Sequence, residues 1–205
     1  YNFDVLTNKG GANLKFVFKK LNFSFGGAIA STQFNQKDNF TNKTFHRSFT
    51  NFFPSASVKY RPRQQQSISF NYNGYTQQPS IDQIQPLRQN TDPLNVSIGN
   101  PNLVQEFDHN LSINFNDYKV FSGLYKYLGA GFNFVNNDIS QAQNINDNLI
   151  RTYQYINVDG NYNGYLYGGL GQSIRKLNMH LGMNTNINLS NNYSFVNGIR
   201  NRNEN

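Results

Sequence analysis

Apolar and polar residues alternate along much of this chain. Between Leu177 and Leu189 the odd-numbered positions are almost all apolar, and the even-numbered positions are Asn, His or Gly. Because successive side chains of a β-strand point to opposite sides, this alternation predicts one long strand with two unlike faces. The expected apolar face holds Leu177, Met179, Leu181, Met183, Ile187 and Leu189, and the expected polar face holds Asn178, His180, Asn184 and Asn186.

The same period of two recurs in other segments. It is regular around residues 14–18, 21–25, 68–72, 111–115 and 124–135, and less regular over 45–60 and 149–170. We expect about eight strands and an all-β fold.

The predicted connections alternate in length. Short ones fall at residues 19–20, 61–64, 117–120 and 172–175, and long ones at 35–44, 76–106, 136–148 and from 191 onward. Short and long connections in turn predict an up-and-down antiparallel sheet whose two rims differ. Outer-membrane barrels have tight periplasmic turns and long extracellular loops.

Alternation alone also fits a soluble barrel or sandwich, so strand length and charge decide between them. Soluble strands run about 5–6 residues, whereas a tilted membrane strand needs about 9–11, and the alternation at 177–189 exceeds both. The polar face of that strand carries no Lys, Arg, Asp or Glu, and only 14% of the whole chain is charged. Both observations favour a transmembrane β-barrel with a wet interior.

Composition excludes several other classes. No apolar run approaches the 18 or so residues of a membrane helix, and the absence of Cys excludes disulfide scaffolds. The net charge of +7 is spread without a dense patch, so we expect no nucleic-acid partner. The 15% aromatic content argues against disorder.

Candidate catalytic residues are few and scattered. His46, His109 and His180 lie far apart in sequence, and His180 should face the polar side while His109 faces outward. Glu106 and Asp108 share a strand face and could pair as an acid and a base, but solvated charges at a rim are the simpler interpretation. We therefore predict no enzyme, no metal and no cofactor.

A series of short motifs then carries a resemblance. The region 76–106 contains Pro79-Ser80-Ile81-Asp82-Gln83-Ile84-Gln85-Pro86, Asp92-Pro93 and Gly99-Asn100-Pro101-Asn102-Leu103. Phe53-Pro54-Ser55-Ala56 precedes it, and Ser194-Phe195-Val196-Asn197-Gly198 follows at the top of the last strand. In this order the motifs resemble the Bacteroidota outer-membrane β-barrel family related to TonB-dependent receptors.

The resemblance implies a fold and a function. Such proteins are gated importers of the bacterial outer membrane, with a plug inside a barrel of about 22 strands. We expect residues 1–205 to be a partial barrel domain of about eight strands, with the plug and signal peptide absent from this sequence. The expected function is energised uptake of a ligand across the outer membrane. The alternative is a non-transporting structural barrel subunit of a larger outer-membrane complex.

The same resemblance implies partners. These are outer-membrane lipid and lipopolysaccharide, a surface lipoprotein or other outer-membrane subunits, and the TonB system acting through segments upstream of this sequence.

The long segment 76–106 is the candidate contact region for a ligand or partner. Its prolines restrict the backbone, and its apolar residues allow it to pack on itself or on the barrel mouth. We expect it to be ordered but without regular strand pairing, above an aromatic rim. The candidate contact residues are Tyr72, Tyr75, Pro79, Ile81, Gln83, Pro86, Arg88, Asp92, Asn95 and Asn100.

Overall fold

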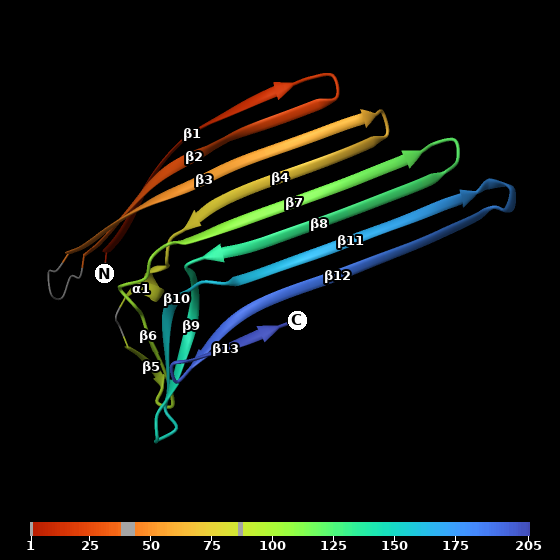
Figure 1. The fold of residues 1–205 in the computed structure, drawn as a ribbon. Coiled ribbons are helices and arrows are strands. Elements are labelled where there is room, and N and C mark those ends of the chain that lie inside the picture. The colour runs from red at the N-terminus through yellow and green to blue at the C-terminus, as the bar shows by residue number, and fades with distance from the viewer. Residues whose placement is uncertain (1, 38–43, 86–87) are drawn as a thin grey trace.

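A computed structural model describes residues 2–37, 44–85 and 88–205, and these form mostly one β-sheet (Figure 1). Eight long strands lie side by side, each antiparallel to its neighbours. In spatial order they are β1 (Asn2–Val17), β2 (Leu21–Lys37), β3 (Thr44–Arg63), β4 (Gln66–Gln77), β7 (Glu106–Lys119), β8 (Leu124–Asn136), β11 (Asn161–Ile174) and β12 (Met179–Val196).

The short connections all lie at one end of the long strands, as Figure 1 shows at the right. They join β1 to β2, β3 to β4, β7 to β8 and β11 to β12. The backbone turns tightly in two of them through left-handed residues, Gly123 with φ 63° and Asn178 with φ 49°. The up-and-down arrangement predicted from connection length is therefore confirmed.

A smaller group of elements lies at the other end, and we call it the long-loop assembly. Its members are α1 (Ile81–Ile84), β5 (Arg88–Asp92), β6 (Asn95–Ile98), β9 (Asp138–Ile145), β10 (Arg151–Val158) and β13 (Ile199–Glu204). The C-terminal end of β12 pairs with β9 in parallel, β9 pairs with β10, and β10 pairs in parallel with β6. The sheet therefore has thirteen strands within the described residues, not about eight.

The prediction of one strand over residues 149–170 is wrong. Asp159 and Gly160 interrupt it, and Gly160 has a φ of 100°, which only glycine adopts readily. The part before the break, β10, belongs to the long-loop assembly. The part after it, β11, is one of the long strands.

Three predicted loops also contain regular structure, and one of them, 136–148, contains β9. The chain does not leave the sheet at residue 191, because β12 continues to Val196 and returns as β13. The turn between them is Asn197 and Gly198, both with positive φ, which is the backbone of a tight two-residue hairpin. The segment 76–106 contains α1, β5 and β6, so the expectation of no regular pairing was wrong. Residues 38–43, most of the connection predicted at 35–44, lie outside the described part.

Pro54 lies within β3. It pairs with Gly27 of β2, while the β3–β4 ladder begins only at Ser55. A proline cannot donate to a ladder, so it fits where β3 has lost its partner on one side. Beyond it, the Thr76 hydroxyl accepts a hydrogen bond from Phe52 N (2.8 Å) and donates to Phe52 O (3.2 Å), rejoining β3 to β4.

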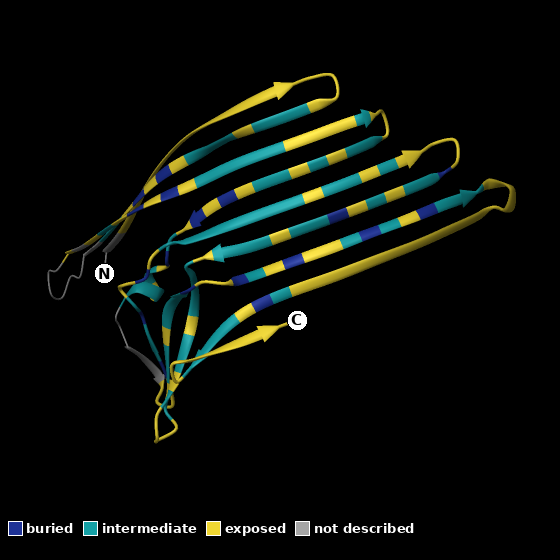
Figure 2. Ribbon diagram, viewed as in Figure 1, coloured by how far each residue is buried: buried dark blue, intermediate teal, exposed yellow. Residues whose placement is uncertain are grey.

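The eight long strands form a single layer with little core. Figure 2 shows the long strands exposed or half-buried over most of their length, and β12 exposed throughout its N-terminal half. Within the described residues the sheet does not close, since β1 pairs only with β2. No helix in the described ranges is long and apolar enough to cross a bilayer.

Candidate functional site

Strand register places the alternating residues on two continuous faces of the eight long strands. Phe70 pairs with Ile113, Ile113 pairs with Ala130, and Ala130 pairs with Leu166. We call this side the apolar face; its exposed large side chains include Leu14, Phe16, Phe25, Ile29, Phe52, Val58, Ile68, Phe70, Ile113, Leu128, Phe132, Leu166, Leu170 and Met183. The other side, the polar face, carries mostly Asn, Ser, Gly and Tyr.

The predicted sidedness of the last long strand is confirmed over most of its length. Met183 pairs with Leu170 and Ile187 pairs with Leu166, both on the apolar face. Met179, Leu181 and Leu189 share that face by parity, and His180, Asn184 and Asn186 lie on the polar face. Leu177 and Asn178 do not belong to the alternation, because they form the 3-10 turn η1 (Arg175–Leu177) and its left-handed cap.

Three of the predicted contact residues, Pro79, Ile81 and Gln83, lie in or next to the short helix α1. Side chains at the start of this helix cap it. Ser80 N donates to the Gln83 side chain (2.8 Å), and Gln83 N donates to Ser80 Oγ (3.4 Å). This reciprocal pair is a capping box. Pro79 is fully buried beside it, and Ile81 is the half-buried first residue of α1.

Asn100 links this helix to β10. Its backbone N–H donates to Gln83 O (2.6 Å) and its side-chain amide donates to Tyr155 O (2.8 Å). Its Oδ1 accepts from Asn102 N (3.0 Å). Gln83 and Asn100 are thus brought together, but their polar groups stabilise the loop rather than face a ligand.

Asp92 and Asn95 are also brought together, in the turn between β5 and β6. The Asp92 carboxylate accepts from Leu94 N (2.9 Å) and from Asn95 Nδ2 (2.7 Å). These hydrogen bonds hold the pKa of Asp92 below its usual range. The bond from the Asn95 amide contributes most, and the bond from the Leu94 N–H contributes next. Arg88 begins β5, where its backbone pairs with Ile98. Pro86 lies outside the described residues.

Tyr72 and Tyr75 do not form one aromatic rim. They are three positions apart in β4 and therefore point to opposite faces. Tyr72 lies on the apolar face, with its hydroxyl 3.1 Å from His109 Nδ1, whereas Tyr75 lies on the polar face. The interpretation of a shared rim is wrong for this reason of parity.

The long-loop assembly is tied to the long strands by specific polar bonds. Arg47 of β3 donates to Pro101 O (2.8 Å) and to Leu103 O (2.6 Å), and Gln105 donates to Asn51 Oδ1 (2.6 Å). Val96 and Leu103 are each 1% exposed, so the assembly has an apolar centre of its own.

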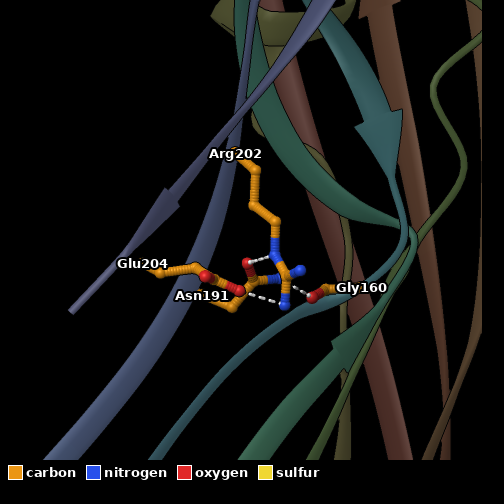
Figure 3. A network of polar contacts seen from close by, with 4 residues as sticks. All are labelled: Gly160, Asn191, Arg202 and Glu204. Atoms are coloured by element: carbon orange, nitrogen blue, oxygen red, sulfur yellow. Dashed lines mark hydrogen bonds and ion pairs between the residues drawn. The ribbon is translucent and has the colours of Figure 1, made fainter.

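A second anchor joins β12, β13 and the β10–β11 turn, as Figure 3 shows. Asn191 is 1% exposed. Its side chain donates to Gly160 O (2.8 Å) and accepts from Arg202 Nε (2.7 Å). Arg202 also forms an ion pair with Glu204. The hairpin made by β12 and β13 is thereby held against the start of β11.

The candidate catalytic residues are not assembled into a site. His109 lies on the apolar face against Phe134, and His180 lies on the polar face beside Ser173 Oγ, as their parity predicted. Glu106 and Asp108 share the polar face, and Glu106 accepts a hydrogen bond from Ile139 N (2.6 Å). No group of three or more potential metal ligands occurs in the part of the chain that the structure describes.

The sequence interpretation missed a row of tyrosines on the polar face, which we call the tyrosine ladder. The pattern Tyr-x-Tyr-x-Gly-x-Gly occurs at 125–131 of β8 and again at 165–171 of β11. Antiparallel register pairs every tyrosine with a glycine: Tyr125 with Gly171, Tyr127 with Gly169, Tyr167 with Gly129 and Tyr165 with Gly131. The repeated pattern was the available signal. Gly169 and Gly171 of β11, like Gly129 and Gly131 of β8, therefore seat aromatic rings.

These rings lie directly over the glycines. A Cβ added at Gly131 would be 2.3 Å from Tyr165 Cζ, and one at Gly129 equally close to Tyr167 Cζ. Consecutive rings along the row have centroids 6.4 Å apart (Tyr125 to Tyr127), 6.2 Å apart (Tyr127 to Tyr167) and 6.1 Å apart (Tyr167 to Tyr165).

Long antiparallel strands with one apolar and one uncharged polar face define the wall of a membrane β-barrel. The chain belongs to the outer membrane protein beta-barrel family, and its match to that family covers residues 1–205.

Among solved structures, the chain is similar to the siderophore receptor PirA from Pseudomonas aeruginosa, at 12% identity and a TM-score of 0.50. The similarity covers 92% of this chain and 45% of the receptor, so the chain spans less than half of that protein's length. This is a likeness of fold. No curated protein sequence matches the chain.

Proposed function

We propose that this chain is part of the wall of an outer-membrane barrel that takes up a ligand by energised transport, in the manner of TonB-dependent receptors. The observation that carries the proposal is the continuous pair of faces. The apolar face would contact lipid and the polar face would line a wet interior. The short turns would lie in the periplasm, and the long-loop assembly would lie outside the cell, next to lipopolysaccharide.

The intact barrel would contain further strands, about 22 in all, together with a plug that contacts the TonB system. Unpaired backbone groups in lipid cost several kcal/mol each, so the exposed edges of β1 and β12 would be paired in the membrane. The end of β13 supports this, since Ser190 and Asn205 already exchange backbone hydrogen bonds (2.9 and 3.1 Å). A strand continuing from there would extend along β12.

The proposal is tested by comparing solutes consumed from the medium by cells with and without the intact protein. We expect one class of solute to be depleted only when the protein is present and the inner membrane is energised. A matched variant lacking residues 82–98 should still insert, because β5 and β6 lie outside the long strands, but should deplete less. If this variant depletes the solute as fully as the intact protein does, the deleted loop does not contact the ligand.

A structural role is the second candidate, and one observation favours it. The polar groups of Gln83, Asp92 and Asn100 are all used within the long-loop assembly. An assembly of this kind would suit a rigid docking surface for a surface lipoprotein or another outer-membrane subunit. If removal of the protein changes no solute uptake but releases another membrane protein from a complex, the structural role holds.

A further inference from the structure

We propose that the tyrosine ladder is a binding track for an uncharged oligosaccharide. This inference rests on the proposed function, because it places the polar face inside the barrel. It adds the chemical class of the ligand and the residues that would hold it.

The ladder presents ring faces rather than ring edges to the interior. Each ring lies over a glycine that has no side chain to lift it from the sheet, so one face of the ring covers backbone and the other is turned away from it. Tyr125 and Tyr127 are nearly parallel, with 7° between their planes, and Tyr165 and Tyr167 differ by 19°. Tyr165 is 39% exposed, so part of its surface is free for contact.

The ladder also runs along the strands instead of across them. β8 supplies the two rings nearer the short turns and β11 supplies the two rings farther along. The sequence Tyr125, Tyr127, Tyr167, Tyr165 therefore forms one row of about even steps in the direction in which a solute would cross the barrel. A row of this form fits an extended repeating ligand better than a compact one.

Hydrogen-bonding groups flank the rings. Tyr167 donates to Asn114 Oδ1 (2.8 Å), which holds that ring in place. In the described part of the chain the hydroxyls of Tyr125, Tyr127 and Tyr165 have no protein partner. Asn116, Asn184 and Asn186 lie on the same face of the neighbouring strands. A sugar ring needs this combination, because its C–H face packs on an aromatic face while its hydroxyls exchange hydrogen bonds with amides and phenols.

Charge decides against ionic ligands. From residue 110 to the short turns, the polar faces of β7, β8, β11 and β12 carry no Asp, Glu, Lys or Arg. An anionic or cationic solute would lose hydration there without gaining a counter-charge. The polar face at the other edge differs, since Lys9, Lys15 and Lys59 lie on it. These lysines belong to β1 and β3, so they lie away from the ladder.

The test uses the intact protein purified in detergent and four neutral probes: maltohexaose, cellohexaose, laminarihexaose and xylohexaose. Titration calorimetry should show binding of at least one. Tyr165→Leu keeps an apolar cover over Gly131 but removes the aromatic face, so it should weaken that binding by about tenfold. Tyr165→Phe should retain most of it, and Tyr162→Leu, on the apolar face, should leave it unchanged.

Each variant is first checked for heat-modifiable migration, which reports a folded barrel. Binding of none of the four probes, equal binding by Tyr165→Leu and the unchanged protein, or stronger binding of a neutral hexapeptide would overturn the inference. If the protein depletes a non-carbohydrate solute from the medium, the inference fails while the proposed function stands. If the protein is not found in the outer membrane, both fail.

Discussion

At the scale of single residues, side-chain parity determines the environment more than residue type does. His109 and His180 are the same residue on opposite faces: one stacks on Phe134 at 4.2 Å between ring centroids, and the other lies 2.8 Å from Ser173 Oγ. Their placement followed from counting positions along the strands. The error over Tyr72 and Tyr75 came from treating sequence proximity as spatial proximity, which an odd spacing in a strand forbids.

Parity gives a direct test at neighbouring positions of β7. Ile113 lies on the apolar face near the middle of the strand, and Ser112 lies on the polar face. Ile113→Arg should destabilise the inserted barrel by about 2–4 kcal/mol, because a guanidinium would be placed in lipid. Ser112→Arg, the matched control, should cost much less. Urea titration of the protein folded into lipid vesicles measures both, and equal costs would contradict the assignment of faces.

Asn191 offers a second test at the residue scale. Its buried side chain satisfies Gly160 O and Arg202 Nε at once, so Asn191→Ala would leave two polar groups without partners. Because Gly160 and Arg202 are exposed and can bond water instead, the expected cost is about 1 kcal/mol, concentrated in the β12–β13 hairpin. Limited proteolysis should show faster cleavage there than in Asn201→Ala, whose side chain is exposed. Identical cleavage of the two variants would mean that the hairpin does not depend on this anchor.

At the scale of elements, the long strands were predictable and the long-loop assembly was not. Alternation identifies a strand that separates two unlike environments, as β7 and β12 do. β9 (DISQAQNI) has no regular alternation, so the sequence predicts a loop there, and the irregular pattern of β10 merges with that of β11. The pairing of β6 with β10 joins residues more than 50 positions apart, and only the folded chain reveals it.

The turn between β5 and β6 should respond to pH. Hydrogen bonds to its carboxylate lower the pKa of Asp92, so the stabilisation it provides is present above the ordinary Asp pKa and is lost as the pH falls through the lower folded value. Protection from hydrogen exchange over residues 88–98, measured relative to the intrinsic rate at each pH, should therefore fall on acidification below about pH 4. Asp92→Asn should lack this step. If Asp92→Asn shows the same pH-dependent step as the original protein, Asp92 does not hold the turn.

At the scale of the whole molecule, the single layer explains why burial gives little guidance to the site. Most large apolar side chains are exposed because their face has no protein partner, as lipid contact requires. The overall design of short turns at one end and ordered loops at the other was readable from connection length. The tyrosine ladder was not recognised in the sequence, because its meaning depends on the register that sets each ring over a glycine.

The orientation of the two ends in the membrane is the last prediction. Phe121, in the β7–β8 turn, is 97% exposed, and Leu149, between β9 and β10, is 75% exposed, so a cysteine at either position would be accessible to solvent. The chain contains no cysteine of its own. An impermeant thiol reagent applied to whole cells should label Leu149→Cys and spare Phe121→Cys, because short turns of outer-membrane barrels lie in the periplasm. Labelling both after lysis is the control for reactivity. Labelling of Phe121→Cys on intact cells would place the short turns outside and reverse the proposed orientation.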